Sequence, residues 1–292
     1  MMVDEEADNA VNSVTDTRKE YQEFLKRLTL FVSKNPDLMT MTLGNIFTMR
    51  LIGNKTHGDM AEIAISEFIN QYMYDFSSKH VGKDLFRAKE HEEDITVVEA
   101  LTKKEIPISL KAYGVGPLQL STDKNERMFP RLEQEGDDIR DRDVIDAIFS
   151  DDSFTSFQSV NVMPLIYDEK HKRCNIMIFD YDKAKRDTAF IVKETAGSGR
   201  LHPVYRFFDA NSQYICEVRY GGASANALQR GLWTNTKTAS QYFTSITGGW
   251  ITYAENMTLL ELFSHALVSS QTGHQKALEA VEADIQRLKK AE

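Results

Sequence analysis

The chain has 292 residues, of which 41% are hydrophobic and 27% are charged, and its formal net charge is −9. This composition is that of a folded globular protein and excludes a disordered or fibrous chain. The length allows one large domain, or one domain with an appended lobe. No apolar stretch reaches the roughly 18 to 20 residues that cross a bilayer, so we expect no membrane-spanning helix.

The first twenty residues hold six acids against two bases, with no basic start followed by an apolar run. A secretion signal is therefore not expected. The two cysteines, Cys174 and Cys216, lack the Cys-x-x-Cys spacing of zinc sites and are too few for a disulfide framework. These observations predict a cytoplasmic protein with two buried, reduced thiols.

Charge is distributed unevenly along the chain. Residues 133–152 hold nine acids against two arginines, whereas residues 183–237 hold nine lysines or arginines against four acids. A protein that is acidic as a whole can still present one basic face to phosphate groups. The negative net charge therefore weighs against nucleic-acid binding without excluding it.

The first predicted elements are helices. Residues 18–34 place apolar side chains at helical spacing, and Asn35-Pro36-Asp37 ends that helix. A second helix is predicted from residue 59 to 76, with apolar residues over most of its surface, so it should be largely buried.

Strands are expected to follow in the middle of the chain. Residues 94–98 are strand-like, 102–105 form a turn and 106–113 form a second strand, which together predict a β-hairpin. The acidic stretch 133–152 predicts a short solvated helix. Five more strands are predicted at 159–167, 174–181, 188–193, 203–208 and 214–220. Helices are predicted again at 224–232, 236–246, 258–269 and 275–292.

This order predicts a mixed α/β fold with a central mixed β-sheet flanked by helices. We expect a single domain over residues 1–292. Its expected parts are an N-terminal helical part (1–55), a catalytic core (56–125), a sheet and DNA-recognition part (155–237) and C-terminal helices (238–292).

The predicted hairpin places a carboxylate beside an ammonium. Along its second strand Ser109, Lys111 and Tyr113 share one face, because side chains alternate. Asp94 opens the first strand and should lie beside the end of the second. Hydrolysis of a phosphodiester needs this pairing of a metal-binding carboxylate and a cation near the attacked phosphate.

A single carboxylate is a poor Mg²⁺ site, and Glu62 is the candidate for a second. At 100° per residue it points the same way as Ile65 and Ile69, on the buried face of its helix. A buried carboxylate needs a partner or a metal to offset its desolvation. The alternatives stay open: Lys111 as a solvated surface cation, and Glu62 as the partner of a core arginine or tyrosine.

These residues resemble the core of the PD-(D/E)XK nuclease superfamily. In that family a carboxylate opens a hairpin, as Asp94 does here, an acid-x-lysine triplet closes it, as Ser109-Leu110-Lys111 does here, and a helix often supplies a glutamate, as Glu62 does. The resemblance implies that Glu62, Asp94 and the Leu110 carbonyl bind Mg²⁺. It also implies that Lys111 positions or activates the attacking water.

Two departures from the family pattern affect this interpretation. Glu93 precedes Asp94 where the family has proline, and Ser109 replaces the usual acid of the triplet. The second departure removes a metal ligand, which makes Glu62 more necessary. Whether Ser109 or Gln119 takes the place of the missing acid is left open.

The wider sequence resembles type II restriction endonucleases, on three segments: residues 57–62, 109–114 and 219–231. The resemblance implies a prokaryotic enzyme that cuts both strands of duplex DNA at a short sequence. It also implies a homodimer formed through residues 18–34 or 275–292, and a cognate DNA methyltransferase in the same system.

Recognition of bases in the major groove uses paired donors and acceptors. The segment from residue 219 to 237 is rich in them, and a Gly-Ser-Gly-Arg loop precedes it. The predicted DNA-binding residues are Arg200, Arg219, Asn226, Gln229, Arg230, Asn235 and Lys237. The alternative for this segment is an ordinary polar helix with loops.

Three rival functions remain. The missing acid at Ser109 favours a catalytically inactive, nuclease-like DNA-binding or regulatory module. An unrelated carboxylate hydrolase, such as a glycosidase, would use two of the many acids. An RNA nuclease is disfavoured because the strands show no aromatic pair on which bases could stack.

Overall fold

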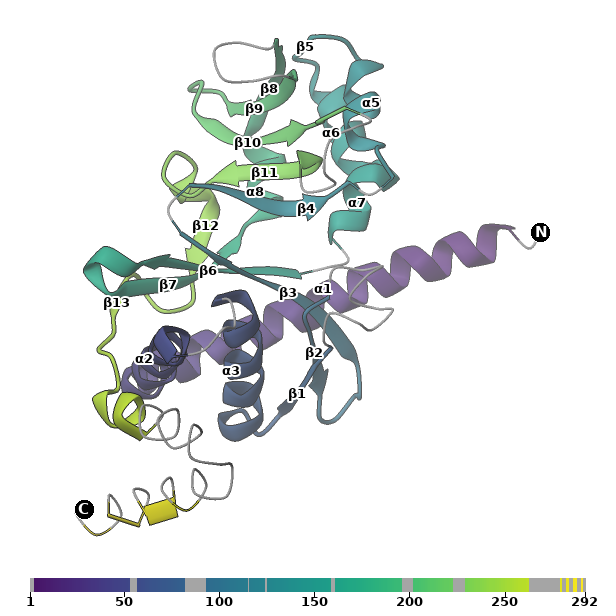
Figure 1. The fold of residues 1–292 in the computed structure, drawn as a ribbon. Helices are drawn as coiled ribbons and strands as arrows, with labels where there is room; N and C mark the ends of the chain where they lie inside the picture. The colour runs from purple at the N-terminus through teal and green to yellow at the C-terminus, as the bar shows by residue number, and fades with distance from the viewer. Residues whose placement is uncertain are drawn as a thin grey trace.

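The computed structural model of the chain describes residues 3–52, 57–81, 93–114, 116–123, 125–158, 161–195, 202–222 and 229–262, with six single positions between 279 and 290. Within these residues no helix is long and apolar enough to cross a membrane. Figure 1 gives the arrangement of the elements.

Three helices form the N-terminal part. They are α1 (Val3–Lys34), α2 (Pro36–Ile52) and α3 (His57–Tyr72). α1 contains the helix predicted at 18–34, and α3 ends four residues earlier than predicted. α2 was missed, although Pro36 occupies the first helical position, where its fixed φ angle and missing N–H cost little.

The first sheet is mixed, as the sequence predicts. Its strands run in the order β1-β2-β3-β6-β7-β12, and β13 also pairs with β7. β3 and β6 are parallel, whereas the other neighbours are antiparallel. The strands are β1 (Phe76–His80), β2 (Ile95–Glu99), β3 (Glu105–Tyr113), β6 (Asn161–Asp168), β7 (Arg173–Phe179), β12 (Phe243–Ser245) and β13 (Ile251–Thr252).

A second, antiparallel sheet follows the order β4-β11-β10-β9-β8-β5. Its strands are β4 (Pro117–Thr122), β5 (Asp138–Ile139), β8 (Thr188–Glu194), β9 (Val204–Asp209), β10 (Tyr214–Arg219) and β11 (Gly231–Asn235). The predicted strands at 188–193, 203–208 and 214–220 are confirmed, but they belong to this sheet. The chain leaves the first sheet at Tyr113 and enters the second at Pro117.

Short helices pack on the second sheet. They are α5 (Met128–Glu133), α6 (Arg142–Ser150), α7 (Asp152–Gln158) and α8 (Tyr181–Asp187). The Asp141 carboxylate accepts hydrogen bonds from the backbone N–H groups of Asp143 and Val144 and so caps α6. The short helix predicted in 133–152 is confirmed as α6, with Ile145 and Ile148 buried on its inner face.

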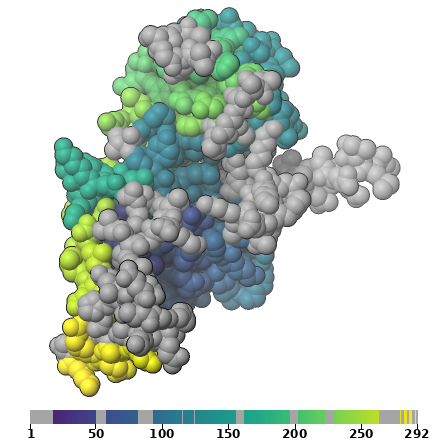
Figure 2. Space-filling view, in the orientation of Figure 1, coloured from purple at the N-terminus to yellow at the C-terminus, as the bar shows by residue number. Residues whose placement is uncertain are grey.

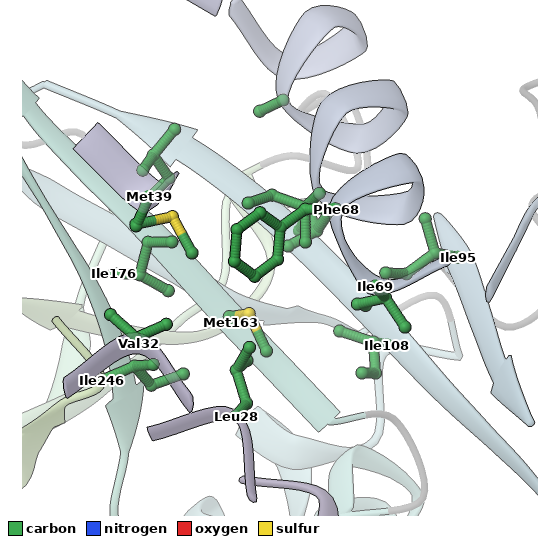
Figure 3. Packing of buried hydrophobic residues seen from close by; sticks show 14 of the residues in the cluster. Leu28, Val32, Met39, Phe68, Ile69, Ile95, Ile108, Met163, Ile176 and Ile246 are labelled. Atoms are coloured by element: carbon green, nitrogen blue, oxygen red, sulfur yellow. The ribbon is translucent and has the colours of Figure 1, made fainter. Parts of the chain in front are cut away.

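Two apolar clusters form the core. One joins α1, α2 and α3 to one face of the first sheet, and Figure 3 shows Ile69 of α3 beside Ile95 and Ile108 of the β2–β3 hairpin. The other joins α5 to α8 and the second sheet to the opposite face of the first sheet. The first sheet is therefore the central layer, and Figure 2 shows the second-sheet lobe above it.

The helix predicted at 236–246 is wrong. Residues 236–239 form turns, η3 (Ser240–Tyr242) is a single 3₁₀ turn and β12 follows. The helix predicted at 224–232 is wrong over its described part, because β11 begins at Gly231. Residues 257–262 are helical, which confirms the start of the helix predicted at 258–269. The remainder of that helix, and the one predicted at 275–292 except for single residues, lie outside the described residues.

Candidate active site

The β2–β3 hairpin places Asp94 beside Ser109, as the sequence predicts. Ile95 pairs with Ile108, and the Asp94 backbone N–H donates to the Ile108 carbonyl at 3.0 Å. Oδ2 of Asp94 accepts two further hydrogen bonds, from Ser109 Oγ at 3.0 Å and from the Leu110 backbone N–H at 2.7 Å. The carboxylate is thus held in place by the strand it faces.

The Asp94 carboxylate takes this position because the two strands of the hairpin differ in length. β2 pairs with β3 only as far as Ile108, whereas β3 continues to Tyr113. The Leu110 N–H is left without a partner strand on that side, and the Asp94 carboxylate supplies the acceptor. The N–H and C=O of one strand residue point to the same side, so the Leu110 carbonyl faces the same edge as Asp94.

Lys111 lies on the face of β3 that carries Ser109, opposite Pro164 of β6. It is half-buried, and within the part of the chain that the structure describes its ammonium makes no ion pair or hydrogen bond. Only Leu110 lies between Lys111 and Ser109, whose hydroxyl donates to Asp94. The pairing of this ammonium with the Asp94 carboxylate stays a prediction.

Glu62 extends from α3 to the same end of the hairpin. Its side chain is buried, 7% exposed, on the face of α3 that carries Ile65 and Ile69. Glu62 Oε2 lies 3.1 Å from Nε2 of His80, the last residue of β1. His80 pairs with Ile95, the residue directly after Asp94.

The two carboxylates interact through space. Burial raises the pKa of Glu62, and the negative charge of Asp94 raises it further. The contact with His80 lowers the pKa of Glu62 but does not cancel these effects. Glu62 and Asp94 are therefore close enough to repel each other, and a cation between them would relieve that repulsion.

The oxygen atoms at this end of the hairpin are of the kind that Mg²⁺ binds. Among the described residues, no three His, Cys, Asp or Glu side chains converge as a metal site. Mg²⁺ is nevertheless commonly held by one or two carboxylates while it keeps several waters. The carboxylates of Glu62 and Asp94 and the Leu110 carbonyl fit such a site in number and chemistry.

Gln119 does not join this group. It lies on β4 of the second sheet, and its amide nitrogen is within 3.0 Å of Thr122 Oγ1 and of the Arg230 carbonyl. Ser109 does face Asp94, but with a hydroxyl rather than a carboxylate. The place of the missing acid is therefore occupied by a hydrogen-bond donor.

Two residues at the site were not among the sequence candidates. His80 was missed because β1 was not predicted and a lone histidine carries no spacing signal. Glu93 is 1% exposed and accepts a hydrogen bond from Thr96 Oγ1. It was noted only as the residue standing where the family has proline, and its burial beside Asp94 depends on the tertiary fold.

The predicted DNA-binding residues divide into separate groups. Arg219 donates to Glu217 Oε1 at 2.5 Å and lies 4.3 Å over the ring of Trp233, on the face of the second sheet away from the core. Arg230 is buried, pairs with Glu126 and donates to the Gly222 carbonyl at 2.8 Å. These contacts favour a structural role for Arg230.

Asn235, Gln229 and Lys237 lie at or beyond the ends of β11. Asn235 Oδ1 accepts from the Lys237 backbone N–H at 2.9 Å and so forms a turn, while Gln229 and Lys237 are exposed. Arg200 and Asn226 lie outside the described residues. The base-reading role of this set stays a prediction.

The expectation that the strands show no aromatic pair is wrong. Phe190 of β8 and Phe208 of β9 are stacked, with ring centroids 5.1 Å apart and an interplanar angle of 19°. Arg140 lies 4.8 Å over the Phe190 ring. The pair arises from cross-strand registry, which local sequence patterns do not reveal, and it removes the argument made against an RNA substrate.

Comparison with known proteins gives no further identification: no protein-family model, no curated protein and no solved structure matches this chain. The case for a function therefore rests on the geometry of the site.

Proposed function

We propose that this chain is a type II restriction endonuclease, a Mg²⁺-dependent enzyme that hydrolyses both strands of duplex DNA at a short specific sequence. The observation that carries the proposal is the meeting of two carboxylates from separate elements at one end of a hairpin. Glu62 comes from α3 and Asp94 from the start of β2, while the next strand adds the Leu110 carbonyl and Lys111.

The chain's own residues account for most of the chemistry. Asp94, fixed by the Ser109 hydroxyl and the Leu110 N–H, presents a carboxylate of defined orientation. Lys111 supplies a positive charge that can hold the attacking water against a scissile phosphate. Mg²⁺ held by Glu62, Asp94 and the Leu110 carbonyl would polarise the phosphate and lower the pKa of a bound water.

The geometry also explains how the site tolerates serine at position 109. A second acid at this position would face Asp94 at hydrogen-bond distance and repel it. The serine instead donates to Asp94 and adds no charge, and Glu62 provides the second carboxylate from the helix. Two carboxylates are sufficient for an ion that keeps its remaining waters.

Duplex DNA is the proposed substrate, and the second sheet is the proposed recognition surface. The outer face of that sheet carries Arg206 and Arg219 beside Trp233. Arginines and amides are the residues that read base edges. A twofold homodimer suits a palindromic site, and a cognate methyltransferase would protect the host DNA.

The test is a digest of supercoiled plasmid with purified protein, in Mg²⁺ and in EDTA. We expect discrete bands in Mg²⁺ and intact plasmid in EDTA. Asp94→Asn keeps an oxygen for the Ser109 and Leu110 donors but removes the charge, so it should fold normally and lose cleavage.

Asp143→Asn is the matched control, because Asp143 is an exposed carboxylate on α6 far along the chain from the hairpin. This variant should cut like the wild type. If Asp94→Asn cuts as well as Asp143→Asn, the proposed centre is wrong.

A second candidate is a nuclease-like DNA-binding module without activity. It is favoured by Ser109 in place of an acid and by the lack of three converging ligand side chains among the described residues. It predicts salt-sensitive DNA binding in a gel shift together with intact plasmid in the Mg²⁺ digest.

A further inference from the structure

Helix α1 is longer than the surface it covers. Its 32 residues correspond to a length of about 48 Å. The C-terminal half packs on the first sheet through Tyr21, Phe24 and Leu28, which are all buried. Figure 1 shows the N-terminal half running out past the rest of the chain.

The apolar repeat of α1 continues into its N-terminal half, beyond the residues that pack on the first sheet. Small and apolar residues, with one threonine, continue at alternating spacings of four and three towards the N-terminus. Over the whole helix the repeat consists of Val3, Ala7, Ala10, Val14, Thr17, Tyr21, Phe24, Leu28 and Phe31. A seam of this period is the signature of a helix that packs along a partner helix.

A groove lies beside the C-terminal half of α1. Its volume is about 610 Å³, and it is lined by α1 on one side and by residues of β6, β7, α8 and β12 on the other. Leu25 and Leu30 face it from α1, and Leu30 is 54% exposed. The charged side chains of the lining are Lys26, which makes no ion pair within the described residues, Asp180, and Arg18 and Asp182, which pair with each other at 2.7 Å.

The two halves of α1 carry opposite charge. Residues 3–17 hold five acids and no base, whereas residues 18–34 hold five bases and two acids. Two copies of α1 placed antiparallel would set the acidic half of each against the basic half of the other. Parallel pairing would instead place like charges together.

We propose that a second copy of this chain occupies the groove, with the N-terminal half of its α1 lying antiparallel against the C-terminal half of the first copy's α1. The contact is isologous, so each chain both donates the acidic half-helix and supplies the groove. The proposal names the surface of the homodimer put forward above, and it uses no property of the hairpin site.

The experiment is light scattering of the full-length protein on a sizing column, without DNA or Mg²⁺, over a range of concentrations. We expect the mass of two 33.3 kDa chains. Leu30→Glu should raise the dimer dissociation constant at least about tenfold. Leu101→Glu is the control, because Leu101 is 86% exposed at the β2–β3 turn, and it should leave the mass unchanged.

Charge exchange tests the antiparallel arrangement. Lys26→Glu alone, and Glu5→Lys with Glu6→Lys, should each weaken the dimer, while the three changes combined should restore it. A monomeric wild type, a dimer indifferent to Leu30→Glu, or a combined variant that fails to recover would each overturn the proposal. Circular dichroism confirms that each variant is folded. Cleavage is measured separately. An inactive dimer leaves this proposal intact, whereas an active monomer contradicts this proposal and the homodimer put forward above but leaves the hydrolytic centre at Asp94 intact.

Discussion

Glu62 and Glu217 are both buried carboxylates, 7% and 3% exposed, yet their surroundings are opposite. Glu217 on β10 receives Arg206 Nε at 3.1 Å and Arg219 Nε at 2.5 Å. Among the described residues, Glu62 contacts a histidine, His80, and experiences the charges of two other acids, Asp59 and Asp94. Two arginines neutralise Glu217, whereas negative charge is in excess around Glu62.

The two buried carboxylates therefore have different roles in the fold. A buried charge must be paired, or it costs folding free energy. The second sheet pairs Glu217 with its own arginines, so Glu217 serves stability. The first sheet leaves Glu62 close to the negative charge of Asp94, and Lys111 on β3 makes no ion pair among the described residues. Groups whose pKa is shifted in this way are common at functional sites.

Of the variants that test this difference, Lys111→Met should have the largest effect, on plasmid cleavage and not on stability. Lys111 has no ion pair among the described residues, so its loss should leave the thermal unfolding temperature nearly unchanged. Plasmid cleavage should fall by about 10²–10³-fold, the usual cost of removing one group that stabilises a developing charge. Lys79→Met, an exposed lysine on β1, is the control and should cleave normally.

Glu217→Ala should have the largest effect on stability. It leaves Arg206 and Arg219 beside a vacated buried position, and we expect a loss of about 3 kcal/mol in the free energy of unfolding by urea. Glu194→Ala removes the more exposed carboxylate that pairs with Arg206 and should cost less than about 1 kcal/mol. Equal losses of unfolding free energy in Glu217→Ala and Glu194→Ala would contradict the structural role given to Glu217.

Ser109→Asp makes the first sheet more acidic. The new carboxylate would lie against Asp94 in a position that is 1% exposed, so it should lower the free energy of unfolding by roughly 2 kcal/mol without metal. Mg²⁺ should then raise the melting temperature more in this variant than in the wild type. A variant with the same Mg²⁺ response as the wild type argues against a cation between these groups.

Glu62→Gln should change the free energy of unfolding less than Glu217→Ala and Ser109→Asp do. The sign of this change tests whether the charge of Glu62 opposes folding. The pKa of Glu62 is raised in the folded chain, so the unfolded chain releases this proton more readily and ionisation at neutral pH opposes folding. The amide removes that penalty, so the variant should be more stable than the wild type at neutral pH. The gain should shrink as the pH falls through the folded-state pKa and disappear near about pH 4. A loss of stability at neutral pH would mean that the contact with His80 dominates.

The hairpin and the burial of Glu62 could be predicted because both are local. Alternating strand residues with a turn define β2 and β3, and the 3.6-residue period places Glu62 with Ile65 and Ile69. The second sheet could not be predicted as a separate layer, because β4 pairs with β11 more than a hundred residues later. A similar separation in sequence hides the pairing of Arg230 with Glu126.

Gly231 is a residue whose role could not be predicted from the local sequence. Its φ is +119°, and a Cβ there would lie 2.1 Å from the Ser121 carbonyl oxygen. The sequence alone offers close approach of the backbone to DNA as the reason for a glycine here, whereas in the fold the glycine is required by the close passage of β4, next to a bulge between Leu232 and Trp233. The residue type required at a position within a sheet depends on the partner strand, which local sequence patterns do not identify.

The central claim is that Glu62 and Asp94 hold one divalent ion together. The most direct measurement is a titration with Mn²⁺, followed by the electron-spin resonance of the free ion, in the absence of DNA. We expect Glu62→Gln and Asp94→Asn each to weaken Mn²⁺ binding by at least about tenfold, while Asp143→Asn binds as the wild type does. Unchanged Mn²⁺ binding in Glu62→Gln and Asp94→Asn would contradict the central claim.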